Sequence, residues 1–134
     1  MADIKIFNPE GLAKPPGTYS HIAQARTQQV VFIAGQVPSD ASGKIVGKGD
    51  IEAQSVQVYA NILTALRAVG ADWTNVVQFT SYLTRTEDAA AFRAWRTREF
   101  PKMFPGGSPP NTLLIINRLA DPDYLLEVQT IAAL

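Results

Sequence analysis

Residues 109–132 have the sequence PPNTLLIINRLADPDYLLEVQTIA. Two apolar runs, residues 113–116 and 125–132, are separated by a segment that contains a proline and two aspartates. This pattern predicts two β-strands joined in a hairpin. Asn111 and Thr112 open the first strand, and Glu127 lies inside the second. Because a lone carboxylate in an apolar strand must face water, a partner or a ligand, these three polar residues define the candidate site.

The composition excludes several kinds of site. Twelve basic and twelve acidic side chains cancel, so no overall field would attract nucleic acid or an anionic membrane. The chain has no cysteine and a single histidine, His21, which excludes thiolate nucleophiles, Cys-ligated zinc and a histidine metal cluster. Its length predicts one domain, residues 1–134. We expect a cytoplasmic protein, because no apolar run approaches a membrane span of roughly 18 residues and the N-terminus lacks a secretory core.

The N-terminal part of the chain predicts three strands and one stiff loop. Residues 4–7 alternate as a short strand does, and the two prolines before Gly17 fix a loop that displays Tyr19. Residues 21–26 alternate weakly, whereas residues 30–34 form a continuous apolar run. We expect these last two segments to form a hairpin.

Two helices are expected further along the chain. Asp50 is a suitable N-cap for a helix whose apolar residues recur every three or four positions, and Gly70 suits its C-terminal end. A strand with one more polar face should follow at residues 76–84. The second helix should begin near residues 87–88 and end at Pro101. It should bury Phe92, Trp95 and Phe100.

The element order predicts an α+β fold in which a six-stranded mixed sheet carries two helices on one face. Two helices can cover only one face of such a sheet. If the other face is apolar, a second copy of the same sheet is the simplest cover, so we expect a closed homo-oligomer.

Four segments resemble motifs of the RidA (YjgF) family, in the family's order. They are GTYS at residues 17–20, VFIAGQVP at 31–38, GDIEAQ at 49–54 and LEVQTIA at 126–132. The resemblance implies a chorismate-mutase-like protomer and a homotrimer whose sheets form an inner barrel, with small-molecule clefts between the subunits. Active members hydrolyse reactive enamines and imines such as 2-aminoacrylate to keto acids and ammonia, without a metal or organic cofactor.

The sequence departs from the family at one position of this cleft. In the family, an arginine that follows a proline and an alanine binds the substrate carboxylate. Counting back from Arg118 places Asn111 at the position of that arginine. A neutral hydrogen bond contributes about 0.5–1.5 kcal/mol net, and one to a charged group about 1.5–3 kcal/mol. Carboxylate binding through Asn111 should therefore be weaker tenfold or more. Arg93 and Arg96 on the second helix could replace the cation, although arginines on a helix surface usually face solvent.

The resemblance also implies roles for the other site residues. Glu127 matches the carboxylate that holds a water, which imine hydrolysis must deprotonate. Tyr19 lines the cleft, Gly35 lets the backbone approach the ligand, and Thr112 offers a backbone N–H and a hydroxyl.

Each of these residues also has a structural interpretation. Glu127 could be an interface residue, Tyr19 a loop-packing aromatic, Gly35 a bend at a strand end, and Asn111 a partner for free backbone groups. His21 is interpreted as structural.

Three functions are consistent with these residues. The first is a hydrolytic deaminase of enamines or imines, with an altered substrate because of Asn111. The second is a ligand-binding or regulatory trimer that has lost catalysis. RNA cleavage is the least supported, because the net charge is zero and the chain has one histidine.

Overall fold

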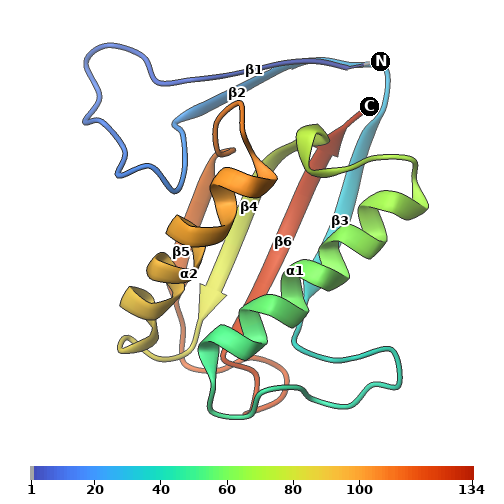
Figure 1. The fold of residues 1–134 in the computed structure, drawn as a ribbon, viewed down its shortest axis with the longest axis vertical. Coiled ribbons are helices and arrows are strands. Elements are labelled where there is room, and N and C mark those ends of the chain that lie inside the picture. The colour runs from blue at the N-terminus through green and yellow to red at the C-terminus, as the bar shows by residue number, and fades with distance from the viewer. Residues whose placement is uncertain (1) are drawn as a thin grey trace.

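The computed structural model describes residues 2–134, which form six strands and two α-helices. The elements are β1 (Asp3–Phe7), β2 (Ile22–Arg26), β3 (Val30–Gln36), α1 (Ile51–Ala68), a 3-10 turn (Trp73–Asn75), β4 (Val76–Leu83), α2 (Asp88–Met103), β5 (Asn111–Ile115) and β6 (Leu126–Ala133). Both helices pack across one face of the main sheet (Figure 1). The predicted α+β class is confirmed.

The main sheet has the strand order β3-β6-β4-β5. β6 lies antiparallel between β3 and β4, and β5 runs parallel to β4. The predicted hairpin between residues 113–116 and 125–132 is therefore wrong, since β4 separates the two strands. The connections explain this order: α2 links β4 to β5 by the long crossover that parallel neighbours require, and both edges of β6 are taken by antiparallel partners.

β1 and β2 form a separate two-stranded sheet. The six predicted strands are thus divided between two sheets, and the predicted hairpin between residues 21–26 and 30–34 is also wrong. The Thr27 hydroxyl donates a hydrogen bond to the carbonyl of Leu134, and the backbone of Gln29 pairs with Leu134 as well. These contacts direct β3 toward β6, where its apolar side chains find a longer and more buried partner than the mostly exposed β2.

The helix ends follow local sequence signals at three of four positions. The Asp50 carboxylate accepts hydrogen bonds from two backbone N–H groups of the first turn of α1. Gly70 follows its last turn with φ +76°, a left-handed conformation that favours glycine. α2 begins at Asp88 as expected but continues through Pro101 to Met103. The proline removes one hydrogen bond near the helix end, whereas Phe100 and Phe104 on either side are buried and hold the last turn against the core.

The core lies between the helices and the sheet and is rich in aromatic rings. The Tyr59 ring centroid is 4.9 Å from that of Trp95 and 5.6 Å from that of Phe79. Phe92, Trp95 and Phe100 are buried as the helical spacing predicted. Tyr59 of α1 thus contacts both Trp95 of α2 and Phe79 of β4, and this packing positions the residues on the flank of α2.

A buried amide ties α1 to the start of β6. The Gln54 side chain donates to the carbonyls of Gly47 and Asp123 at 3.1 and 2.9 Å, and accepts from the N–H of Leu125 at 2.8 Å. Gln54 is fully buried. It therefore satisfies backbone groups of two loops that would otherwise lose their hydrogen bonds on burial.

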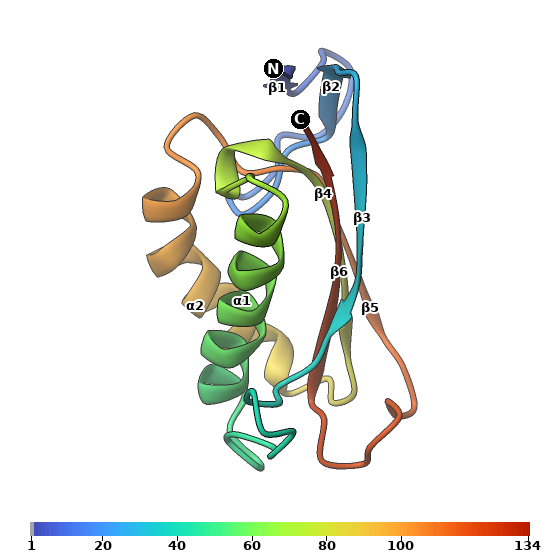
Figure 2. The same cartoon turned by 90° about the vertical axis from the view of Figure 1, so that its right-hand side faces the viewer.

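The opposite face of the main sheet carries no helix, as the edge-on view in Figure 2 shows. Phe32 on β3 is 73% exposed there, and Leu114 on β5 is exposed as well. Strand alternation places Glu127 and Tyr82 on this same face, because they are paired and alternate with the buried Leu83 and Leu126. This uncovered face thus combines apolar side chains with one carboxylate.

Candidate functional site

A cavity of about 240 Å³ lies where the loop before β2, helix α2 and the start of β5 meet. Two predicted site residues, Tyr19 and Asn111, line it together with two arginines of α2. The remaining walls include Thr18 and Leu113. Two of the four sequence-predicted substrate-binding residues and two arginine charges therefore come together here.

Asn111 points toward the face of the sheet that the helices cover. It pairs with the buried Phe79 in the parallel ladder between β4 and β5. Its Oδ1 accepts a hydrogen bond of 2.7 Å from the hydroxyl of Ser81, which is fully buried on β4. This bond fixes the amide and leaves its N–H groups as donors beside the cavity.

Arg96 is the residue whose environment differs most from the expectation. Arg93 is exposed, but only 4% of the Arg96 surface is accessible. Its guanidinium carbon lies 4.3 Å from the centroid of the Phe92 ring. The expectation that both arginines face solvent is therefore wrong for Arg96. A signal was present in the sequence, since Arg96 lies four residues from both Phe92 and Phe100 and hence on the apolar side of the helix.

The Arg96 charge has no negative partner within residues 2–134. The ion pairs of this part of the chain involve Lys48, Arg85, Arg98 and Lys102. The Nε–H of Arg96 is buried and donates to no partner among the described residues. Burial lowers the pKa of Arg96, with Arg93 adding to this effect and Tyr59 opposing it. Burying a cation without a negative partner costs free energy of folding, and here that cation lies beside a cavity.

Tyr19 is held half-buried on the cavity wall by its loop. Its ring meets the His21 ring edge-on, with centroids 5.9 Å apart. The His21 Nε2 lies 2.7 Å from the carbonyl oxygen of Ala13, and its backbone N–H donates to the side chain of Asn8. His21 thus braces the loop that carries Tyr19, in agreement with its structural interpretation.

Glu127 lies on the uncovered face, against Gly35. A methyl group added to Gly35 would lie 2.5 Å from the Oε1 atom of Glu127, well inside van der Waals contact. Gly35 also falls within the irregularity of the β3–β6 ladder, between Ile33 and Gln36. Its φ is not positive, so the glycine is needed here for the space that the carboxylate occupies.

The five predicted site residues therefore form two groups within one protomer. Tyr19 and Asn111 line the cavity under α2, whereas Gly35 and Glu127 meet on the other face of the sheet. Thr112 is exposed and pairs with Thr80, so strand alternation places it on the same face as Glu127.

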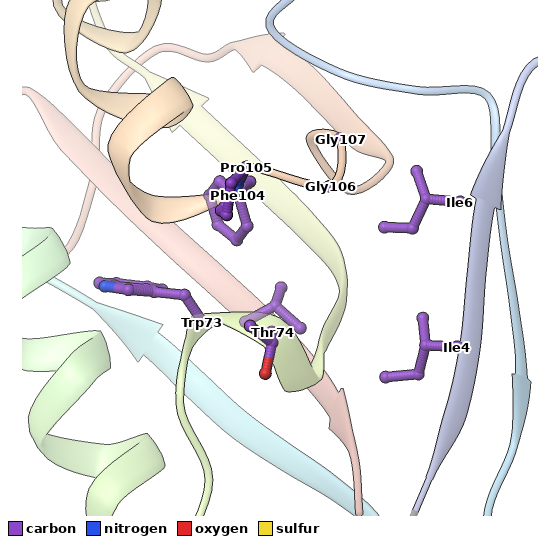
Figure 3. A pocket seen from close by; sticks show the side chains of 9 residues that line it. Ile4, Ile6, Trp73, Thr74, Phe104, Pro105, Gly106 and Gly107 are labelled. Carbon is purple, nitrogen blue, oxygen red and sulfur yellow. The ribbon is translucent and has the colours of Figure 1, made fainter.

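A second cavity, of about 160 Å³, lies between β1 and the segment that follows α2. Figure 3 shows that the side chains of Ile4 and Ile6 extend from β1 toward Phe104 and Thr74. The polar side-chain groups on its walls are the Thr74 hydroxyl and the indole N–H of Trp73. Because small-molecule sites usually combine apolar walls with several convergent polar groups, this cavity is a weaker candidate.

Residues 2–134 contain no group of three or more His, Cys, Asp or Glu placed to hold a metal ion. None of the helices in this part of the chain is both long and apolar enough to cross a membrane.

The family model described as Endoribonuclease L-PSP matches residues 12–134. The chain belongs to this family. It is the family of the RidA, YjgF and RutC proteins, so the resemblance seen in the sequence motifs is confirmed.

Individual relatives of the RidA family agree over nearly the full chain. A RutC family protein of Pyrococcus horikoshii is 33% identical over 128 residues, which cover 96% of both chains. Another from Synechocystis is 30% identical over 132 residues, or 98% of this chain and 97% of the relative. A crystal structure from Yersinia pestis, of a Rid family protein of unknown function, matches with a TM-score of 0.87 at 31% identity over 98% of both chains. The predicted chorismate-mutase-like fold is thereby confirmed.

Proposed function

We propose that the protein is a hydrolytic deaminase that converts reactive enamines or imines into a carbonyl compound and ammonia. The observation that carries this proposal is the position of Glu127. Its carboxylate lies half-buried against Gly35 and forms no ion pair within the described chain, 2–134. A carboxylate kept free in this way is available to move a proton.

The reaction needs one proton-transfer group and one water. An enamine first gains a proton from solvent on carbon and becomes an iminium ion. Glu127 then takes a proton from the water as its oxygen bonds to the iminium carbon. Glu127 returns this proton to the nitrogen of the resulting carbinolamine, ammonia leaves as the C–N bond breaks, and the hydroxyl proton passes to solvent as the carbonyl forms. No metal or organic cofactor takes part in these steps.

The complete site in this proposal needs two copies of the chain. Asn111 lies on β5 and Gly35 on β3, which are the opposite edges of the main sheet. A head-to-tail contact repeated around a closed ring would place the β5 edge of one copy beside the β3 edge of the next. The exposed Phe32 on the uncovered face supports the homotrimeric barrel that the family resemblance implies.

The oligomer is tested by light scattering coupled to gel filtration. We expect the mass of three chains. A stable monomer at micromolar concentration would leave Tyr19 and Asn111 in a separate site from Glu127 and would contradict the proposed composite cleft.

Catalysis is tested by ammonia release from enzymatically generated 2-aminoacrylate and from an imine without a carboxylate. Glu127→Gln should reduce the rate by about 10²- to 10⁴-fold, the usual contribution of a positioned acid–base group. Glu10→Gln is a matched control on an exposed loop and should act like the wild type. Equal rates for Glu127→Gln and wild type would remove Glu127 from the mechanism.

The alternative is a small-molecule-binding or regulatory trimer without catalysis. The neutral Asn111, whose oxygen already accepts from Ser81, favours it. In that case a ligand binds, but ammonia release equals the buffer background. Ribonuclease activity, which the family description names, has less support, because the net charge is zero and the one imidazole contacts the carbonyl of Ala13.

A further inference from the structure

The polar groups around the cavity under α2 are mainly donors. Arg96 and Arg93 contribute two guanidinium groups, and Asn111 contributes its amide N–H groups because its oxygen is engaged by Ser81. No aspartate or glutamate lines this cavity. The cavity walls therefore carry excess positive charge and no negatively charged group.

Arg96 is the central group of this set. Only 4% of its surface is accessible, and its guanidinium carbon lies over the Phe92 ring, 4.3 Å from the ring centroid. The stacking restrains the guanidinium plane before any ligand arrives, so little side-chain freedom remains to be lost on binding. A surface arginine would satisfy its N–H groups with water, whereas the Nε–H of Arg96 is shielded from it.

We propose that Arg96 binds a carboxylate of the substrate and so supplies, from helix α2, the positive charge that Asn111 on β5 lacks. The carboxylate accepts hydrogen bonds from the Arg96 guanidinium and the Asn111 amide, and the exposed Arg93 adds attraction at the rim. A carboxylate fits better than a phosphate, because one buried cation with a neutral amide balances a single negative charge. This inference rests on the proposed function only where it calls the bound molecule a substrate.

The cavity is also of the right size for a small acid. Its volume of about 240 Å³ equals that of about eight waters at roughly 30 Å³ each. A three-carbon keto acid fits within this space. Tyr19, which carries an aromatic ring and a hydroxyl, also lines the cavity.

The test is an NMR titration of the full chain with pyruvate, and with pyruvamide as its uncharged analogue. The wild type should bind pyruvate and not pyruvamide, with shifts at the amides of Thr18 and Asn111. Arg96→Gln should weaken pyruvate binding at least tenfold, while Arg96→Lys keeps most of it. Arg98→Gln is the matched control, since it removes a charge from the same helix at a residue outside the cavity.

Four results would overturn the proposal. These are absence of saturable pyruvate binding to the wild type, equal binding by Arg96→Gln, tighter binding of inorganic phosphate than of pyruvate, and dissociation of the oligomer by Arg96→Gln. The last result would mean that Arg96 pairs with a carboxylate of a neighbouring copy.

Binding and turnover are separated by measuring pyruvate binding and ammonia release on the same preparations of the wild type and Arg96→Gln. If pyruvate binding depends on Arg96 but no ammonia is released from any imine, the deaminase proposal fails and the anion site remains.

Discussion

Replacing Arg96 with methionine should stabilise the folded protein while it removes anion binding. Moving a charged group out of water costs several kcal/mol, and replacing buried ionic groups by apolar ones of similar volume often stabilises a protein by about 1–4 kcal/mol. Here the loss of the cation–π contact with Phe92 subtracts about 1 kcal/mol. Contact of the methionine sulfur with the same ring partly replaces it. The expected net gain is about 1–3 kcal/mol.

The assay is thermal unfolding followed by circular dichroism at a fixed protomer concentration, because the stability of an oligomer depends on concentration. For a chain of this length, the gain corresponds to a rise in Tm of about 3–10 °C. Arg98→Met is the control, since the Arg98 ion pair with Glu52 is exposed and contributes at most about 1 kcal/mol. Pyruvate should raise the Tm of the wild type but not that of Arg96→Met.

A fall in the stability of Arg96→Met by more than about 1 kcal/mol would refute this reasoning. It would show that the Arg96 charge is already compensated in the folded protein and that the cavity does not need an anion from outside.

Three further predictions concern the remaining site and the scaffold. Gly35→Ala should lower ammonia release toward the rate of Glu127→Gln, because the new methyl group displaces the Glu127 carboxylate; unchanged release would exclude that effect. Gln54→Leu should lower the free energy of unfolding by about 2–4 kcal/mol in urea, since it leaves buried backbone groups without partners. Hydrogen bonds from Thr74 hold the pKa of Asp72 below its ordinary 3.8. The stability that this provides is present above about pH 4 and is lost as the pH falls through the lowered pKa. Denaturant unfolding of Asp72→Asn should therefore differ from that of the wild type at neutral pH and converge with it in acid.

Local signals in the sequence predicted the elements well because each depends on a few neighbouring residues. Asp50 caps α1 and Gly70 follows its end, as expected from hydrogen bonding and left-handed φ. Strand pairing was predicted poorly. Both expected hairpins were wrong, because proximity in the chain favours adjacent strands whereas the structure pairs β3 with β6 and β5 with β4. Which strands pair depends on the crossover connections and on the total area buried, and a short stretch of sequence contains neither.

The sequence by itself determined the family and the fold class, and it predicts that Asn111 stands at a position where the family keeps arginine. Those features depend only on the identities of the residues and on their spacing. Only the tertiary structure decided that Asn111 and Glu127 lie on opposite faces of one sheet, and that Arg96 is enclosed beside Asn111 without an acidic partner in residues 2–134. The reason is physical: the burial of a charge depends on every element packed around it, and here those elements are a loop, a helix and a strand that are distant in the chain.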